Sequence, residues 1–503
     1  MATAAARSPD FTDQHAVEPE SALPRMAWRP VLAVAGVVGL ALLIASRNYG
    51  YFFDEAYFVV AGRDHLAWGY FDQPALVPAL AAAMQHLAPD SLIMLRLPAT
   101  VAAVAGTILT ALIARELGGG RGAQVLAAIG YALSSAVLLC HWLATYSLDP
   151  VFWTAIIWLV VRWARLHAAG RPDDRLLLYA GLVTVFSLQT KFLVPALWVA
   201  LVLCALVFGP RRLVTRPALW LGGAVAALAT VPNLVWQQRN QWPYTHMSEV
   251  VAAEFPGVGR FLWDSASGAG LAVGLPLLLI GAPALLISTR FRTYRFAGAA
   301  LVLVFLAYLA SSGRSYYACG LYALPIAAGA VVVASVAKHI AARGLVAVVL
   351  AIGIAMGAAA VPVYPRSWAE RIPDTNLMLT AKAFAQSDTM IGDLSDAVTA
   401  AYNGLPDELR ARTAIVADSY PFAAAVDLHH DSTGLPRAYS GHRAYYYFGA
   451  PPESATAVLY LGTPPPALTA AFTSSEPVIP DLATLLVDRT VPWSTLWPQL
   501  RAQ

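Results

Sequence analysis

Long apolar runs, most of them bounded by arginines, recur along the chain from residue 31 to residue 361. A helix needs about 20 apolar residues to cross a lipid bilayer. The composition agrees, since 58% of the 503 residues are apolar, 13% are charged and the mean hydropathy is +0.58. An ordinary soluble domain has roughly 25% charged residues. We therefore predict a mainly α-helical, polytopic membrane protein.

These runs provide eleven candidate spans. The first follows Arg25 and Arg29, and we interpret it as a signal anchor. Two others, 176–189 and 192–208, are short and nearly adjacent, which is typical of a tilted or re-entrant hairpin covered by protein or water. The remaining runs are 31–46, 97–114, 122–140, 149–163, 217–236, 267–288, 296–312, 318–337 and 344–361.

Basic residues are divided unevenly between the loops on the two sides. With the N-terminus inside, 17 Lys and Arg lie in cytoplasmic segments and seven in outer ones. Because basic residues concentrate on the cytoplasmic side, residues 1–30 are predicted to be a cytoplasmic segment. An odd number of spans then places the C-terminus outside, on the periplasmic or extracellular face of a bacterial inner membrane. The seven outer residues are Arg47, Arg63, Arg96, Lys191, Arg239, Arg260 and Arg314.

Two further parts follow the N-terminal segment. Residues 31–361 form the predicted transmembrane catalytic domain, whose outer segments 48–95 and 237–267 are too long to be simple turns. Residues 362–503 alternate strand-like and helical runs, which predicts a small extracytoplasmic α/β domain. This tail holds 9 basic and 14 acidic residues in a chain of net charge +3, which argues against nucleic acid as a partner. Its clearest runs are the strand-like 413–417 and 457–461 and the helical 377–384.

An acidic pair, Asp54 and Glu55, follows the first span and lies among aromatic residues. A carboxylate near lipid is costly unless a partner or a water-filled cavity compensates, so the pair indicates a functional site. The alternative is that Asp54 caps a juxtamembrane helix and Glu55 lies in its first turn. Both can hold, since a capped helix can aim the first carboxylate.

Three basic residues at the outer ends of spans are candidates for binding a lipid phosphate: Lys191, Arg314 and Arg96. Arg314 is followed closely by Tyr316 and Tyr317, whose hydroxyls can join it in charge-assisted hydrogen bonds at headgroup depth. Single cations at such positions can instead be snorkelling anchors.

A second acid, Asp149, precedes Pro150 and could either start a helix or serve the site. His141 could join Asp54, Glu55 and Asp149 around a divalent metal, but no ligand spacing supports this, and a metal stays an open question. The three cysteines all lie in or beside apolar runs and are expected to be buried and unpaired; they are Cys140, Cys204 and Cys319.

Several motifs occur together in the order found in one bacterial family. Those in the membrane part are Asp54-Glu55-Ala56-Tyr57, Trp68-Gly69-Tyr70-Phe71-Asp72-Gln73-Pro74, Leu95-Arg96-Leu97-Pro98, Thr190-Lys191, Pro232-Asn233-Leu234-Val235-Trp236-Gln237, Trp242-Pro243, Arg314-Ser315-Tyr316-Tyr317 and Leu324-Pro325. Those in the tail are Gly434-Leu435-Pro436, Tyr439-Ser440-Gly441-His442 and Gly449-Ala450-Pro451-Pro452. With these motifs the chain resembles the polyprenyl-phosphate-sugar-dependent glycosyltransferases of the GT-C fold, the branch related to protein mannosyltransferases and the lipid A aminoarabinose transferase.

The resemblance implies an active site on the outer face, a lipid monophosphate sugar donor and no nucleotide. We therefore expect an inverting transfer of one sugar to a hydroxyl of a glycan, lipid or protein acceptor. Asp54 is the expected base, with Glu55 supporting it and Asp149 as second acid. Lys191, Arg314, Tyr316, Tyr317 and Arg96 are expected on the donor phosphate. Expected sugar or acceptor contacts are His65, Tyr70, Asp72, Gln73, His141, Tyr146 and Tyr445.

Two departures from the family pattern bear on the acceptor. Ala75 follows Pro74 where a second proline is expected, and Arg443-Ala444-Tyr445 stands where an Asn-Ser-Tyr-like run is expected. The sequence therefore leaves the acceptor and the sugar open.

Two other classes of function are compatible with the composition. A lipid or solute transporter such as a flippase would suit many spans, but it would place polar groups near the bilayer midplane and tend to contain internal repeats, and the sequence has neither. A carbohydrate-binding receptor would leave Asp54 and Glu55 unexplained.

Overall fold

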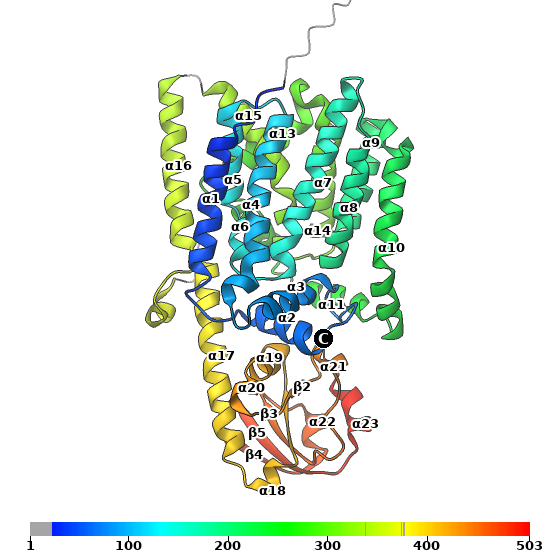
Figure 1. Ribbon diagram of the computed structural model, residues 1–503, viewed down its shortest axis with the longest axis vertical. Coiled ribbons are helices and arrows are strands. Elements are labelled where there is room, and N and C mark those ends of the chain that lie inside the picture. The colour runs from blue at the N-terminus through cyan, green and yellow to red at the C-terminus, as the bar shows by residue number, and fades with distance from the viewer. Residues whose placement is uncertain (1–22, 338, 374, 376–377, 503) are drawn as a thin grey trace, which may run out of the picture.

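The structure is a computed structural model, which describes residues 23–502 except 338, 374, 376 and 377. Residues 1–22 of the predicted cytoplasmic segment lie outside the described residues. A bundle of long helices forms the larger part, and a small α/β domain covers one end of it (Figure 1). The chain enters the bundle at the opposite end, so the first described residues and the C-terminal domain lie at opposite ends (Figure 1).

Each predicted span coincides with a helix or a bent pair of helices, so the mainly α-helical fold class is confirmed. Within the described residues, six helices are long and apolar enough to cross a membrane, or up to eight if each bent pair is one span. The number eleven stays a prediction, because three of the predicted spans are shorter apolar helices, Arg175–Thr190, Val194–Phe208 and Gly274–Ile287. The bundle helices are α1 (Trp28–Ala45), α4 (Leu92–Glu116), α5 (Arg121–Ala132), α6 (Ser135–Leu138), η1 (Leu139–His141), α7 (Thr145–Ala168), α8 (Arg175–Thr190), α9 (Val194–Phe208), η2 (Arg211–Thr215), α10 (Pro217–Arg239), α13 (Gly274–Ile287), η4 (Thr289–Tyr294), α14 (Arg295–Ala310), η5 (Ser315–Leu321), α15 (Ala323–Val336) and α16 (Ile340–Ala360).

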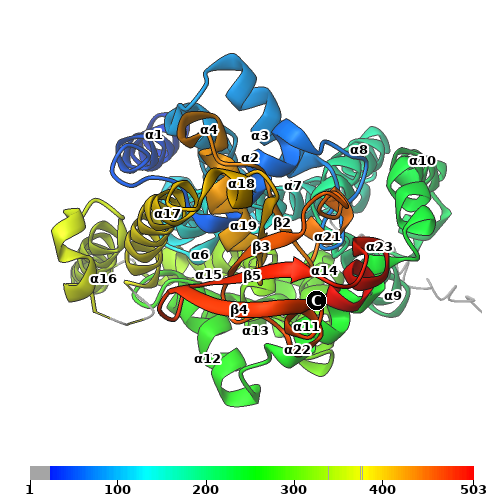
Figure 2. The same ribbon diagram turned by 90° about the horizontal axis from the view of Figure 1, so that it is seen from below.

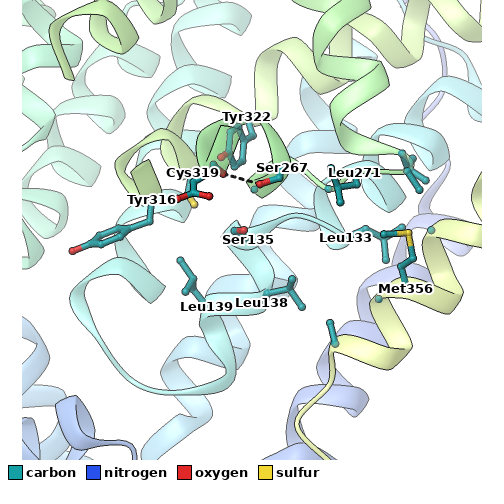
Figure 3. Close-up of a pocket in the computed structure, with 18 of the residues that line it drawn as sticks. Leu133, Ser135, Leu138, Leu139, Ser267, Leu271, Tyr316, Cys319, Tyr322 and Met356 are labelled. Atoms are coloured by element: carbon teal, nitrogen blue, oxygen red, sulfur yellow. Dashed lines mark hydrogen bonds between the residues drawn. The ribbon is translucent and has the colours of Figure 1, made fainter. Parts of the chain in front are cut away.

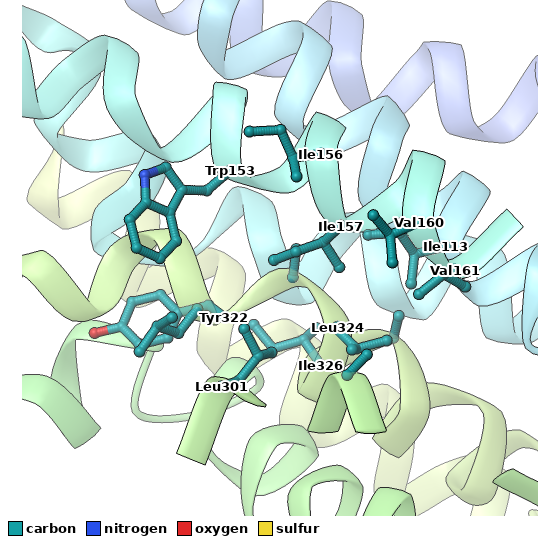
Figure 4. Packing of buried hydrophobic residues seen from close by; sticks show 14 of the residues in the cluster. Ile113, Trp153, Ile156, Ile157, Val160, Val161, Leu301, Tyr322, Leu324 and Ile326 are labelled. Carbon is teal, nitrogen blue, oxygen red and sulfur yellow. The ribbon is translucent and has the colours of Figure 1, made fainter. Parts of the chain in front are cut away.

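The bundle core is packed from apolar side chains of α7, α14 and α15. Trp153, Ile156 and Val160 of α7 are at most 1% exposed. Trp153 lies beside Tyr322, and Ile157 points toward Leu324 of α15 (Figure 4). Helices α13 and α15 cross very closely at Gly329. A Cβ at this position would lie only 1.9 Å from the carbonyl oxygen of Leu277, so the crossing requires glycine. Such close approach at small residues is how helices associate without a hydrophobic driving force.

The two bent pairs break at the end of the bundle that faces the C-terminal domain. The α5–η1 pair bends by 57° and the η5–α15 pair also by 57°. These breaks leave short helical segments, η1 and η5, that carry His141, Tyr316 and Tyr317. Irregular backbone is tolerated in a membrane protein where it is buried or lines a cavity.

The two long outer segments form short helices. They are α2 (Phe53–Asp64), α3 (Leu76–Leu87), η3 (Pro243–His246), α11 (Met247–Ala253) and α12 (Val258–Gly268). Of these, α2, α3 and α11 lie between the bundle and the C-terminal domain (Figure 1).

The C-terminal domain contains one five-stranded mixed sheet of order β2-β1-β3-β5-β4. Strands β1 and β3 coincide with the predicted strands 413–417 and 457–461, and all their residues are buried, as expected for parallel strands covered on both faces. Seen from below, helices lie on both sides of the sheet (Figure 2). The elements are η6 (Arg366–Arg371), α17 (Leu379–Asn403), α18 (Asp407–Arg410), β1 (Thr413–Ala417), α19 (Tyr420–Leu428), α20 (His430–Thr433), β2 (Ala438–Ser440), α21 (Tyr445–Phe448), β3 (Ala457–Leu461), α22 (Pro466–Thr469), β4 (Phe472–Ile479), β5 (Ala483–Arg489), α23 (Trp493–Leu496) and η7 (Trp497–Leu500).

Polar contacts fix this domain to the first outer segment. The backbone N–H of Gly50 donates to Asp388 at 2.9 Å, and the Arg63 guanidinium donates to the carbonyl of Asp427 at 2.8 Å. The His65 ring stacks on Phe448 with centroids 4.1 Å apart. The C-terminal domain is therefore held in one orientation over α2.

Asp427 in α19 makes the stability of the C-terminal domain depend on pH. Its carboxylate accepts hydrogen bonds from the backbone N–H of Ala438 at 2.7 Å and the Tyr445 hydroxyl at 3.1 Å. Burial raises the pKa of Asp427 to about 7, against an ordinary value of 3.8. The folded domain thus binds a proton that the unfolded chain releases between these values, and its stability falls as pH rises from about 4 to 7. Between pH 5 and 8, the melting temperature of Asp427→Asn should change less with pH than that of the wild type. An unchanged slope would assign the pH dependence of stability to other groups.

Candidate functional site

Asp54 lies in the first turn of α2, at the junction of the bundle and the C-terminal domain. Its carboxylate accepts two hydrogen bonds, from the Tyr146 hydroxyl at 2.8 Å and from the Tyr420 hydroxyl at 2.7 Å. Tyr146 belongs to α7 and Tyr420 to α19 of the C-terminal domain. Burial, and then the Asp54 charge, raise the pKa of Tyr420 well above its ordinary value, so Tyr420 stays a hydrogen-bond donor. The side chain of Asp54 is thus aimed into the junction rather than toward lipid.

Glu55 has a different environment and makes a buried ion pair with Arg96. The Arg96 guanidinium donates to Glu55 at 2.7 and 2.9 Å, and both side chains are at most 1% exposed. The backbone N–H groups of Phe52 and Leu143 also donate to Glu55. The other Arg96 donors reach the carbonyls of Ser46 and Gly50.

These contacts correct two interpretations. The donors of Arg96 are used inside the protein, so this residue is not available for the donor phosphate in this structure. The residue before α2 is Phe52, and Glu55 rather than Asp54 satisfies its backbone N–H, in the manner of a capping box. Glu55 and Arg96 therefore form the framework that holds Asp54.

Lys191 and Arg314 converge on the same two tyrosines, although they are far apart in the sequence. The Lys191 ammonium lies over the rings of Tyr316 and Tyr317, at 4.8 and 4.4 Å from the centroids. The Arg314 guanidinium donates to the Tyr316 hydroxyl at 3.2 Å. Cations over aromatic faces are attracted by the ring quadrupole. The structure thus brings two of the three predicted phosphate-binding cations together.

The cations and Asp54 share one aromatic wall. The ring of Tyr316 packs on that of Tyr146 with centroids 5.2 Å apart, and Tyr146 in turn donates to Asp54. The carboxylate and the two cations therefore face one junction.

Asp149 lies deeper in the bundle than a helix start would place it. Helix α7 begins at Thr145, so the interpretation of Asp149 as the start of a helix is wrong. Asp149 is 7% exposed, and its carboxylate accepts hydrogen bonds from Ser187 at 3.1 Å and Trp153 at 3.2 Å.

Several residues at the junction were not predicted from the sequence. Tyr420 donates to Asp54, the Arg443 guanidinium lies 5.2 Å from the ring of Tyr420, and Glu254 pairs with both Arg314 and Arg443. In the sequence, Arg443 stands out only as a departure from the family pattern, next to the tail motif that ends at His442.

The predicted sugar and acceptor contacts divide into two groups. Asp72 accepts a hydrogen bond from Tyr57 at 2.9 Å, burial raises its pKa, and the nearby Arg443 opposes that rise. Gln73 is buried beside it, and its amide nitrogen donates no hydrogen bond within the described part of the chain. The other five make contacts inside the protein: the His65 ring stacks on Phe448, and hydrogen bonds join Tyr70 to the backbone of Ala61, His65 and Ala67, His141 to the carbonyl of Leu138, Tyr146 to Asp54, and Tyr445 to Asp427.

Metal and thiol chemistry find no support in the described residues. Among them, no three His, Cys, Asp or Glu side chains gather in a way that could hold a metal ion, so the residues considered for one, His141, Asp54, Glu55 and Asp149, do not form a ligand set. The three cysteines are buried and free, as predicted.

A cavity of about 250 Å³ lies next to the junction, between α6, η5, the end of α12 and α16. Figure 3 shows Tyr316 at one end of it and Met356 of α16 at the other, with leucines such as Leu138 and Leu271 between them. Helix α16 lies at the edge of the bundle, and only 6% of its apolar stretch is buried against the rest of the protein. The cavity therefore extends from Tyr316 at the junction to a helix at the edge of the bundle.

Comparison with known proteins agrees with this architecture. Residues 72–236 match the model of the family described as dolichyl-phosphate-mannose-protein mannosyltransferase. No curated protein matches the chain.

Two solved structures share the fold over nearly their whole length. ArnT from Cupriavidus metallidurans bound to undecaprenyl phosphate has a TM-score of 0.54 and 15% identity, covering 91% of this chain and 97% of that one. The same ArnT in the apo state has a TM-score of 0.53 and 16% identity, covering 92% and 98%. The chain thus shares the GT-C fold of these structures, and over residues 72–236 it resembles the protein mannosyltransferase family, as predicted.

Proposed function

We propose that this protein is a membrane glycosyltransferase that moves one sugar, with inversion, from a polyprenyl monophosphate to an acceptor hydroxyl. The observation that carries the proposal is the common aromatic wall, which joins the Asp54 carboxylate to the cations Lys191 and Arg314. The match to the mannosyltransferase family and the fold shared with an ArnT that binds undecaprenyl phosphate support a lipid-linked donor.

The chemistry needs one base and one anion-binding group. Asp54 takes the proton of the acceptor hydroxyl as its oxygen attacks the anomeric carbon of the sugar. The bond between that carbon and the phosphate oxygen breaks, and its electron pair leaves with the polyprenyl phosphate. Lys191 and Arg314, aided by Tyr316 and Tyr317, stabilise the charge that develops on the departing phosphate. A single displacement inverts the anomeric configuration.

Each substrate has a place in this scheme. The first isoprene units of the donor lie in the cavity beside Tyr316, which they enter from the lipid past α16. Asp149, close to Lys191, helps to position that ammonium. Asp72 and Gln73 face the sugar or the acceptor.

The direct test is incubation of the purified protein with labelled donors. Polyprenyl phosphate should be released from a polyprenyl-monophosphate sugar when an acceptor is present. Nucleotide sugars and diphosphate-linked sugars should not react. A transporter or a carbohydrate receptor would release no polyprenyl phosphate from any donor, and that result would end the proposal.

Replacing the cations should weaken donor binding. Lys191→Ala or Arg314→Ala each removes a charge-assisted bond worth about 1.5 to 3 kcal/mol, which corresponds to a roughly 10- to 100-fold loss of affinity. Titration with a polyprenyl phosphate measures the loss, and Arg239→Ala, an exposed cation at the end of α10, is the matched control. Equal affinity for the Lys191→Ala and control variants would remove Lys191 from the donor site.

The site is proposed to lie on the outer face of a bacterial inner membrane, with the tail in the periplasm or outside the cell. The division of basic residues, 17 on one side and seven on the other, supports this orientation. A reporter that works only outside the membrane should be active when fused after Gln503 and silent when fused after Arg171. The reverse pattern would overturn the orientation.

A further inference from the structure

Glu254 is held between two arginines that belong to different parts of the molecule. Its carboxylate accepts a hydrogen bond from Arg314 Nε at 2.7 Å and pairs with Arg314 Nη2. Its other oxygen accepts a hydrogen bond from Arg443 Nη2 at 3.3 Å. Arg314 precedes η5 of the bundle, whereas Arg443 follows β2 of the C-terminal domain. One carboxylate thus links two guanidinium groups at the edge of the site.

The arginines are more enclosed than the carboxylate between them. The side chains of Arg314 and Arg443 are 20% and 16% exposed, and that of Glu254 is 43% exposed. Glu254 lies in the short connection between α11 and α12, which contains Gly257 at φ +88°. An ion pair with such an exposed partner contributes little stability, so the carboxylate can leave at small cost.

Arg443 is fixed by the backbone and keeps an unused donor. Its own N–H donates to the carbonyl of Ala502 at 3.1 Å, and its φ of +50° is uncommon for a residue with a side chain. Such a conformation persists only where the surrounding structure enforces it, and it is frequent at functional sites. The buried Nε of Arg443 has no hydrogen-bond partner among the described residues.

Arg443 also belongs to the surroundings of the proposed base. Its guanidinium lies over the ring of Tyr420, whose hydroxyl donates to Asp54. An anion bound between Arg314 and Arg443 would therefore be next to the reacting groups.

From this arrangement we infer that Glu254 occupies the position of the donor phosphate, and that a lipid phosphate displaces it and binds to Arg314 and Arg443 together. This inference rests on the proposed function and extends it, because it adds Arg443 of the C-terminal domain to the phosphate site. Planar guanidinium groups bind phosphate oxygens in pairs, which a single carboxylate bridging both arginines cannot match. The charge of the phosphate increases when the sugar leaves, so two arginines favour the product side of the reaction. The return of Glu254 then helps the polyprenyl phosphate to dissociate.

Binding of farnesyl phosphate, a 15-carbon polyprenyl monophosphate, to the purified full-length protein tests the inference. Farnesol, which lacks the phosphate, is the ligand control. Glu254→Gln should bind farnesyl phosphate about tenfold more tightly than the wild type, because the competing charge is gone. Glu249→Gln, which removes an exposed charge from the neighbouring α11, should leave the affinity unchanged.

A second pair of variants tests the role of Arg443. Arg443→Gln should weaken farnesyl phosphate binding about tenfold and should cancel the gain when it is combined with Glu254→Gln. Arg437→Gln, which removes an arginine of the same domain that pairs with Asp64, should bind like the wild type. Farnesol binding should be the same in all variants.

The outcomes separate this inference from the proposed function. If the wild type prefers farnesyl phosphate to farnesol but Glu254→Gln binds it equally or more weakly, Glu254 is only a bridge between domains and the inference is wrong. If the wild type does not distinguish the two ligands, the lipid-phosphate donor itself is wrong.

Discussion

Asp54→Asn is expected to lower turnover about 10²- to 10⁴-fold, the usual contribution of a positioned general base. Asparagine keeps the shape of the side chain. Its oxygen can accept a hydrogen bond from one of Tyr146 and Tyr420, and its amide can donate to the other hydroxyl. It cannot take a proton from the acceptor. Release of labelled polyprenyl phosphate under single-turnover conditions measures the chemical step.

The specificity of this effect depends on two controls. Donor affinity and folded yield of Asp54→Asn should equal those of the wild type, because no buried pair is broken. Asp90→Asn, an exposed acid in the same outer segment, should turn over normally. Near-normal turnover of Asp54→Asn would remove Asp54 as the base and make Asp149 the leading candidate.

Glu55→Gln is expected to lower the stability of the protein strongly, whereas Asp54→Asn lowers turnover. The variant leaves Arg96 charged and buried beside a neutral amide, and breaking such a pair costs about 3 to 5 kcal/mol. Folded yield and the melting temperature in detergent should therefore fall sharply. Activity per folded molecule should change much less than in Asp54→Asn.

A double-mutant cycle isolates the ion pair. Arg96→Met alone should also destabilise, because it leaves the Glu55 carboxylate buried without its cation. The double variant Glu55→Gln with Arg96→Met should lose less stability than the sum of the two single losses, since neither charge is then left unpaired. A Glu55→Gln variant of normal stability but without activity would instead place Glu55 in the chemistry.

The sequence predicts best those features that depend on local pattern. Strands β1 and β3 are continuous apolar runs because the sheet buries both of their faces, and the spans are apolar for the same physical reason. Strand β4 was not predicted, since six consecutive residues along it are exposed and no alternation of apolar and polar residues marks it.

The site is only partly predictable because its contacts are distant in the sequence. Asp54 and Tyr420 are separated by 366 residues, and no spacing rule relates them. Arg96 was interpreted as a phosphate ligand because it is a cation at the outer end of a span, yet its partner, Glu55, is 41 residues earlier. Residue types at helix ends thus identified the region, whereas only the fold shows which charges neutralise one another.

A structure of the protein with bound polyprenyl phosphate tests the central claim most directly. We expect the phosphate oxygens within hydrogen-bond distance of Lys191 and Arg314, the isoprenoid chain in the cavity beside Tyr316, and an open space between the phosphate and Asp54 for the sugar. A phosphate bound away from both cations, or on the far side of the bundle from Asp54, would contradict the account.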